Sequence, residues 1–212
     1  MPTGKALQNV TASSILVMVN SQPIELVGNR IRLTPLSEIH LPALWKAGHH
    51  PEIWQIAMNI MESEQDMERY VRIALQEQAE GRALPFATTL LETGEIIGST
   101  RFGNIEAAHK RVEIGWTWIT LNYQRTFVNT EAKYLMLTHA FETWDVNRVE
   151  LKTDVLNTKS RNAMLRIGAK EEAVLRHHVI RENGTVRDNI FYSILKSEWP
   201  EVKQNLEEMM RK

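Results

Sequence analysis

The sequence predicts an α+β (mixed α/β) protein that is built on one continuous sheet. Runs with the two-residue alternation of strands come first in a block and later alternate with runs of helical period. Asn183-Gly184, the strongest short hairpin signal, joins the last two strand-like runs. No linker, repeat or low-complexity tract divides the chain. We therefore expect one domain over residues 23–200, an N-terminal extension over 1–22 and a C-terminal helical tail over 201–212.

The composition excludes several classes of function. The chain has 212 residues, 43% of them hydrophobic and 24% charged, which is typical of a soluble globular protein with a sizeable core. The net charge of −1 gives no general attraction to nucleic acid or to an acidic membrane, so we expect neither partner. The absence of cysteine excludes disulfides, thiolate metal sites and cysteine-bound intermediates.

We expect a cytoplasmic protein without a metal site. No run approaches the roughly 18 apolar residues that a membrane span requires. The short apolar run at residues 15–19 lacks the features of a signal peptide. The histidine pairs 49–50 and 177–178 do not have the spacing of metal ligands.

The first half of the chain is expected to hold strands at both ends and helices between them. Turn, cap and stop residues fix their limits. The expected elements are a strand at 24–36 with a turn at Gly28-Asn29, a helix capped by Ser37 and ending at Gly48, a short helical piece after Pro51, a helix from Ser63 to Gly81, and strands at 86–92 and 95–102 joined at Thr93-Gly94.

A strand that leads directly into a helix organises the second half. Val112, Ile114, Trp116 and Trp118 alternate with more polar residues and are expected on one face of a strand. A helix should follow from about residue 129 to 144, with Asn129 or Thr130 as its N-cap. The N-terminus of such a helix offers free amides and the positive end of a dipole, which favours an anion such as phosphate. An ordinary strand-to-helix connection would have the same pattern.

Further elements complete the expected sheet. They are a strand at 149–155, a helix capped by Asn157 or Thr158 and ending at Gly168, a hairpin of residues 172–181 and 186–195, and a charged helix from Ser197.

This element order and two motifs resemble the GNAT superfamily of acyl-CoA-dependent N-acetyltransferases, in particular its RimJ/RimL-like branch. The first motif is Gln-Arg-Thr-Phe-Val-Asn, which matches the family pattern at Gln124 but has Phe127 and Asn129 where the family carries glycine. The second motif is Asn157-Thr-Lys-Ser160 with Gly168 behind it. The resemblance implies a mixed, mostly antiparallel sheet flanked by helices, and transfer of an acetyl group from acetyl-CoA to a primary amine by direct attack in a ternary complex.

The resemblance also implies which residues hold the cofactor. The loop and the helix N-terminus should bind the pyrophosphate, and the strand end and the second motif should bind the pantetheine arm. For Asn157 a plain N-cap is an equal alternative. The expected cofactor residues are Trp118, Ile119, Thr120, Gln124, Arg125, Thr126, Phe127, Val128, Asn129, Thr130, Asn157 and Ser160.

Two residues are candidates for the chemistry. An attacking amine must lose a proton, and Glu113 on the central strand is the candidate base; a paired or exposed strand glutamate is the alternative. Ser160 is the candidate donor to the leaving thiolate, because Met164 stands where many relatives carry a tyrosine acid. The first helices, with Trp45, Trp54, Met58 and Met61, and the terminal hairpin should form the acceptor side.

Two functions remain open at this stage. The first is the N-acetyltransferase, with a protein N-terminus or a small amine as acceptor. The second is a non-catalytic module of the same fold that senses CoA or binds a protein, which Phe127 and Met164 favour. Exposed edge strands are compatible with a homodimer.

Overall fold

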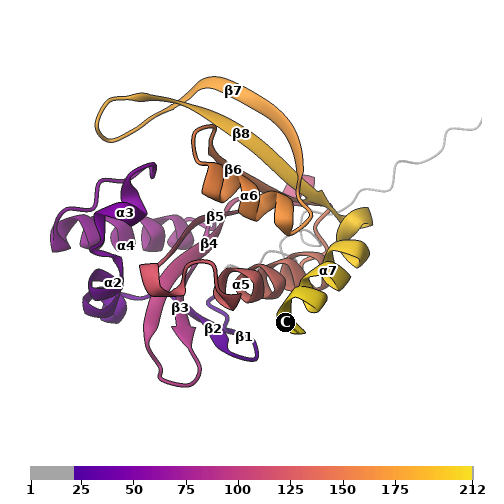
Figure 1. Ribbon diagram of the computed structural model, residues 1–212, viewed down its shortest axis with the longest axis horizontal. Helices are drawn as coiled ribbons and strands as arrows, with labels where there is room; N and C mark the ends of the chain where they lie inside the picture. Colours follow the sequence, from indigo (N-terminus) through magenta and orange to yellow (C-terminus); the bar gives the residue numbers. More distant parts are fainter. Residues whose placement is uncertain (1–21, 212) are drawn as a thin grey trace, which may run out of the picture.

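The computed structural model describes residues 22–211, so the expected extension over 1–22 lies almost entirely outside the described residues. Strands and helices alternate along the chain as Figure 1 shows. The strands are β1 (Leu26–Val27), β2 (Ile31–Pro35), β3 (Leu84–Leu90), β4 (Ile96–Glu106), β5 (Arg111–Ile119), β6 (Arg148–Asp154), β7 (Lys170–Ile180) and β8 (Val186–Leu195). The α-helices are α2 (Leu41–Gly48), α3 (Pro51–Trp54), α4 (Glu64–Ala79), α5 (Phe127–Thr138), α6 (Thr158–Arg166) and α7 (Trp199–Arg211).

Short turns of other helix types complete the described chain. They are the 3-10 turns η1 (Glu38–His40), η2 (Ala107–His109), η3 (Leu121–Tyr123) and η5 (Lys196–Glu198), and the π-helical segment η4 (His139–Thr143) that continues α5.

All eight described strands form one sheet in the order β1-β2-β3-β4-β5-β6-β8-β7. Only β5 and β6 pair in parallel, and the other neighbouring pairs are antiparallel. The predicted fold class, a mixed and mostly antiparallel sheet flanked by helices, is therefore confirmed.

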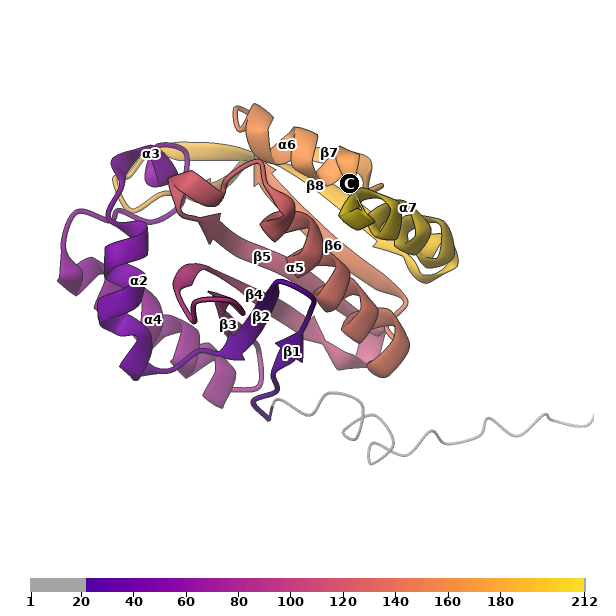
Figure 2. The same cartoon turned by 60° about the horizontal axis from the view of Figure 1, so that its bottom comes forward.

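Helices cover both faces of the sheet and make two separate cores. On one face, α2 and α4 pack on a cluster that includes Leu44, Tyr70 and Trp118. On the other face, α5, α6 and α7 cover the larger cluster. Figure 2 shows α5 lying across the sheet with α7 beside it. Trp199 of α7 stacks on Phe141 at 5.4 Å between ring centroids, so the C-terminal helix is fixed to this layer.

Local sequence signals explain most element limits. Ser63 caps α4, because its Oγ accepts the Asp66 amide at 3.3 Å while the Asp66 carboxylate accepts the Ser63 amide at 2.9 Å. Gly94 and Gly184 have φ of 73° and 79° in the turns of the two predicted hairpins. Their left-handed backbone is the conformation that glycine adopts without steric cost.

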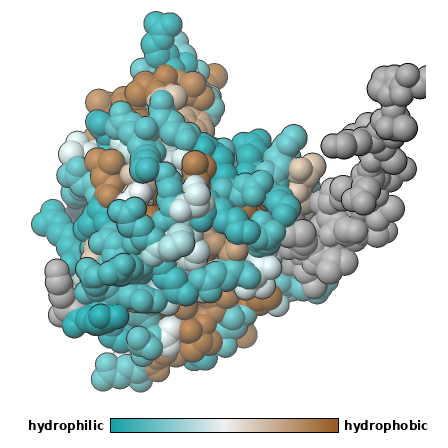
Figure 3. Space-filling view, turned by 90° about the vertical axis from the view of Figure 1, so that its right-hand side faces the viewer, coloured by the Kyte–Doolittle hydropathy of each residue, from teal (hydrophilic) through white to brown (hydrophobic). Residues whose placement is uncertain are grey.

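The β7–β8 hairpin leaves an apolar surface at one end of the molecule. Val174, Leu175, Ile180 and Val186 are all exposed on it, and Figure 3 shows apolar side chains gathered at this end. A homodimer stays a prediction, which light scattering in solution would test. Within residues 22–211, no helix is long and apolar enough to cross a membrane.

Candidate active site

A β-bulge in the central strand creates the site. The register of β5 against β4 shifts between the pair Ser99–Trp118 and the pair Arg101–Gly115. Trp116, inside the bulge, has φ of 50°, a left-handed backbone that is rare for a bulky residue. Bulges of this kind redirect the side chains that follow them, and strained residues collect at functional sites.

The bulge corrects one prediction. Val112 and Ile114 belong to the core under α5, but Trp118 belongs to the core under α2 and α4. Trp116 packs against that second core as well, so the four residues do not share one face. The strict two-residue alternation fails because the bulge adds a residue, and this leaves Thr117 on the α5 side of the strand.

Trp116 is held by its neighbours in this unusual conformation. The Arg101 guanidinium lies 4.5 Å from its ring centroid, and Lys152 Nζ lies at 5.9 Å. A Cβ at Gly103 would lie 2.3 Å from the indole ring, so only glycine admits the ring there. The Tyr70 hydroxyl donates to the Trp116 carbonyl at 3.2 Å. The bulge is therefore fixed from α4 and from two neighbouring strands.

Beyond Glu113 the central strand has an open edge. The parallel pairing joins residues 111–113 with residues 148–150 and then ends. Figure 2 shows β5 and β6 diverging from that point. Within the described chain, no strand pairs with residues 114–119 on this side, although β4 pairs with them on the other. Such an edge can bind an extended ligand through its backbone, as an added strand would be bound.

Helix α5 begins at the end of this edge. Its N-cap is Thr126, whose Oγ accepts the Val128 amide at 3.4 Å, so the prediction of Asn129 or Thr130 as N-cap is wrong. The helix begins two residues earlier because Thr126 has an extended backbone and a side chain that can cap it. Thr126 takes the Val128 amide, and the amides of Phe127 and Asn129 have no partner within the helix and are available to an anion.

Phe127 and Asn129, which stand where the family carries glycine, do not distort the N-terminus of α5. Phe127 and Asn129 are helical and have no positive φ, whereas Arg125 just before them has φ of 62°. The Arg30 guanidinium covers the Phe127 ring at 3.7 Å, so the ring is packed towards the β1–β2 turn. A pyrophosphate could therefore still contact these amides without meeting strained backbone.

The loop between β5 and α5 is tied to the open edge. Gln124 Nε2 donates to the Ile119 carbonyl at 2.9 Å, and the Thr120 amide donates to the Ile97 carbonyl at 2.8 Å. Arg166 of α6 donates to Thr130 Oγ1 at 3.0 Å. The predicted cofactor segments, 118–120 and 124–130, are thus neighbours in space.

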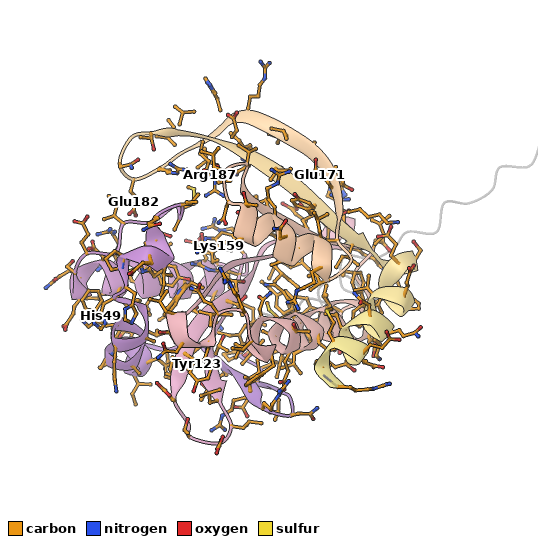
Figure 4. All side chains as sticks on the ribbon, viewed as in Figure 1. His49, Tyr123, Lys159, Glu171, Glu182 and Arg187 are labelled. Carbon is orange, nitrogen blue, oxygen red and sulfur yellow. The ribbon has the colours of Figure 1, made fainter. Side chains whose placement is uncertain are left out.

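The second predicted motif lies at the N-terminus of α6. Asn157 Oδ1 accepts the Ser160 amide at 3.0 Å, which is the N-cap alternative from the sequence. Its Nδ2 makes no hydrogen bond within residues 22–211, and neither does the Ser160 hydroxyl. Both groups can therefore still serve a ligand. In Figure 4, Lys159 of this helix and Tyr123 of η3 lie on opposite sides of the space between α6 and α5.

Glu113 lies on the opposite side of the sheet, towards α4. Its side chain is only 4% exposed, and its Oε2 accepts Asn104 Nδ2 at 2.6 Å and Lys152 Nζ at 2.7 Å. Its Oε1 accepts no hydrogen bond from the described residues. The predicted base is therefore a paired carboxylate with one oxygen left, and Ser160 is carried by a helix on the other face.

A cavity of about 490 Å³ lies beside α2 and α3, and Glu113 is not among the residues that line it. All four residues expected on the acceptor side line it, together with two residues of the β7–β8 hairpin. They are Trp45, Trp54, Met58, Met61, Arg181 and Asn183. The expected place of an acceptor pocket, between the first helices and the terminal hairpin, thus holds a cavity.

Glu182 holds the tip of the hairpin over this cavity. One carboxylate oxygen accepts the Ile60 amide at 2.6 Å, and the other accepts Asn59 Nδ2 at 3.3 Å. Arg69 of α4 lies 3.5 Å from the same carboxylate. Figure 4 shows Glu182 between the hairpin and the α3 region. This contact joins segments that are more than a hundred residues apart, so no local pattern in the sequence predicts it.

Two further charged groups, Asp154 and Lys133, were not among the site residues predicted from the sequence. Asp154, 2% exposed at the end of β6, pairs with Arg181 and lies 3.7 Å from Arg187, and burial lowers the pKa of the Arg187 guanidinium. On α5, burial lowers the pKa of Lys133 to about 7, and its Nζ donates to Thr117 Oγ1 at 2.9 Å. The sequence carried a signal for Lys133, because it falls between apolar residues on the buried stripe of the helix.

Among residues 22–211 there is no group of three or more metal-binding side chains.

Comparison with known families supports this geometry. The model of an acetyltransferase (GNAT) domain matches residues 30–170. The Bacillus subtilis (strain 168) protein YdaF, a candidate ribosomal N-acetyltransferase, is 36% identical over 110 residues, which are 52% of this chain and 59% of YdaF. The Escherichia coli (strain K12) ribosomal-protein-serine acetyltransferase is 24% identical over 176 residues, covering 81% of this chain and 97% of that protein. The matched part spans 59–66% of three of the curated relatives.

Solved structures share the fold. A candidate acetyltransferase from T. thermophilus superposes with a TM-score of 0.81 and 33% identity, covering 89% of this chain and 97% of that one. Mycobacterium smegmatis RimJ in complex with CoA-disulfide gives a TM-score of 0.74 at 24% identity, covering 90% and 97%. The resemblance drawn from the sequence is therefore confirmed.

Proposed function

Since the chain belongs to the GNAT acetyltransferase family, we propose that it moves the acetyl group of acetyl-CoA to a primary amine. The observation that carries this proposal is the open edge of β5 with the N-terminus of α5 at its end. Together they offer backbone groups for an extended arm and amides for a diphosphate.

The donor would lie on the α5 and α6 side of the sheet. The amides of Phe127 and Asn129 would hold the pyrophosphate, and the edge at residues 116–119 would pair with the pantetheine arm. Asn157 Nδ2 is a further donor towards that arm, because Oδ1 alone serves as the N-cap. These roles follow from the free hydrogen-bonding groups of each segment.

The acceptor would enter from the side of α2 and α3. The cavity there is lined by aromatic and methionine side chains together with polar ones such as His49 and Glu62. Glu113 lies outside this lining, beside Lys152, whose Nζ is 5.9 Å from the Trp116 ring. Glu113 Oε1 would take the proton of the attacking amine, directly or through one water, while Lys152 and Asn104 fix the carboxylate through Oε2. Holding amine and thioester at the open edge would supply much of the rate enhancement.

A protein N-terminus is the acceptor class that we propose. The Escherichia coli relative is named for acetylating serine of a ribosomal protein. The open cavity at the hairpin tip has room for the first residues of a peptide, and its apolar lining with Arg181 and Asn183 offers both packing and polar contacts.

The first experiment is a thermal melt with and without acetyl-CoA. A ligand at 100 times its Kd stabilises a fold by about 2.7 kcal/mol, which is roughly 5–10 °C for a chain of this size. Asn157→Ala should reduce that shift. Release of free CoA thiol is then followed with peptides that begin with serine, with the same peptides N-acetylated as controls, and with free amino acids and polyamines.

Each result decides between functions. Thiol release with free peptide N-termini and none with the blocked peptides supports the proposal. A melting shift without turnover on any amine would instead favour a CoA-sensing or protein-binding module. The buried Met164, at the position where many relatives carry a tyrosine acid, is the observation that keeps this second function in view. No shift and no turnover would refute both.

A further inference from the structure

Lys133 is a buried amine that the proposed acetyl transfer has not yet used. It lies on α5, its side chain is 6% exposed, and its Nζ points to the central strand, where it donates to Thr117 Oγ1 at 2.9 Å. Within the described residues this is its only hydrogen bond, and no carboxylate pairs with it. A buried ammonium normally has a charged partner, because removing it from water is costly. An amine kept without one calls for an explanation.

The charged groups on the surrounding elements are bound elsewhere. Glu131 of α5 accepts the amides of the β1–β2 turn and pairs with Arg30 at 3.6 Å. Arg166 of α6 donates to Thr130 Oγ1, and Glu207 of α7 accepts the Tyr134 hydroxyl at 3.0 Å.

The charged residues of β4, β5 and β6 face away from Lys133. Arg101 pairs with Glu77 at 2.7 Å, and Glu113 pairs with Lys152, all on the α4 side. The lowered pKa of Lys133 is therefore due to burial.

Thr117 connects Lys133 to the open edge. It follows the bulge, at a level where β6 has already diverged, and it is exposed although it bonds to a buried amine. Its Oγ1 lies 2.9 Å from Lys133 Nζ and 2.7 Å from Thr100 Oγ1. A hydroxyl has two acceptor sites and one proton. When Lys133 and Thr100 donate to it, the Thr117 proton is held only by the Gly115 carbonyl at 3.4 Å, a long hydrogen bond that a ligand between β5 and β6 can replace.

We propose that Thr117 donates a proton to the thiolate of CoA as it leaves, and that Lys133 positions this hydroxyl and replaces its proton. The inference rests on the proposed function. The carbon–sulfur bond breaks, its electron pair stays on sulfur, sulfur takes the proton of Thr117 Oγ1, and Oγ1 takes a proton from Lys133 Nζ. Lys133 becomes a neutral amine and regains a proton from water through Thr117 after CoA leaves. The proton lost by the acceptor amine reaches solvent through Glu113, so the proton count closes.

Two properties of the site fit this role. The family's tyrosine acid is replaced by the buried Met164, so the thiolate needs another donor. The Ser160 hydroxyl has no hydrogen-bond partner within residues 22–211 that could replace its proton, whereas Thr117 has Lys133 at 2.9 Å. An acid works best when its pKa lies near the working pH, and that of Lys133 is about 7.

The first test uses turnover with a matched pair of variants. Thr117→Val removes the hydroxyl at constant size, and Thr117→Ser retains it. We expect kcat to fall about 100-fold or more in Thr117→Val, with the Kd of acetyl-CoA unchanged within about twofold, and to recover in Thr117→Ser. Retention of wild-type kcat in Thr117→Val would overturn the inference.

The pH profile separates a chemical role of Lys133 from a structural one. In the wild type kcat should fall as the pH rises above about 7, because the donor loses its proton. Lys133→Met should have a lower kcat without that descending limb, and Lys133→Arg, which stays protonated, should lack the limb as well. Lys133→Met removes a buried charge and is expected to fold. An unchanged profile in Lys133→Met would refute the role.

Binding tests the contact with sulfur without any turnover. CoA and desulfo-CoA differ only in the thiol, and calorimetry gives the Kd of each. The wild type should bind CoA several-fold more tightly, and Thr117→Val should bind both alike. Equal affinities in the wild type would overturn this inference but leave the proposed function intact. Binding of neither compound would overturn both.

Discussion

The buried amine of Lys133 should leave a measurable signature in the pH dependence of stability. Its ordinary pKa is 10.5, and burial lowers it to about 7 in the folded protein. Between these two values the unfolded chain binds one more proton than the folded chain. The free energy of unfolding must therefore rise with pH across this window, since stability increases with pH wherever the unfolded state holds more protons. Below about pH 7 the cost of the buried charge is fully present and constant.

The size of the effect follows from the shift. Each pH unit inside the window is worth about 1.4 kcal/mol, so from pH 7 to pH 9 Lys133 should add about 2–3 kcal/mol to the free energy of unfolding. Lys133→Met has no group to titrate and should lack this contribution. The difference in stability between the variant and the wild type should therefore be largest near pH 7 and shrink towards pH 9.

Urea unfolding at half-unit steps from pH 6.5 to 9.5 measures this difference directly. Other groups that titrate in this range are common to both proteins and cancel in the subtraction. Lys46→Met, which removes an exposed lysine of α2, is the matched control and should run parallel to the wild type. A constant difference between Lys133→Met and the wild type, within about 0.5 kcal/mol, would refute the assignment of a buried, shifted amine.

Three further perturbations test the frame of the site. Gly103→Val should lower the melting temperature by several degrees and reduce turnover, because its Cβ would lie 2.3 Å from the Trp116 ring; an unchanged melt would show that the indole can move. Glu131→Ala should destabilise the fold by about 2–4 kcal/mol in urea unfolding, because three amides of residues 29–31 lose their acceptor, and Glu131→Gln should cost less. Glu182→Ala should raise KM for the peptide about tenfold without changing the Kd of acetyl-CoA, because the hairpin tip is released; an unchanged KM would separate the tip from acceptor binding.

Local chemistry in the sequence was enough to predict the order of the elements. Turns at Gly28-Asn29, Thr93-Gly94 and Asn183-Gly184, and the cap at Ser63, each depend on residues within a few positions of one another. The acceptor side was expected from the resemblance and not from local chemistry, and the residues named for it line one cavity. Contacts that join distant segments could not be predicted in this way. Glu182 with Ile60 and Lys133 with Thr117 exist only once the sheet has formed.

The bulge at Trp116 determines which side of the sheet the side chains of Thr117 and Trp118 face. Without it, Trp118 would lie under α5 and Thr117 would face α4. With it, Trp118 packs on the side of α2 and α4, where its ring lies 5.5 Å from that of Trp54, and Thr117 faces Lys133. Gly115 is a weak signal of the bulge, since glycine inside a strand often marks one, but a tryptophan with positive φ is what local preference argues against. The conformation persists because Arg101, Gly103 and Tyr70 hold it from outside the strand. The site therefore depends on packing from β4 and α4. Substitutions in these two elements should alter the rate of the reaction, although their residues do not contact the proposed substrates.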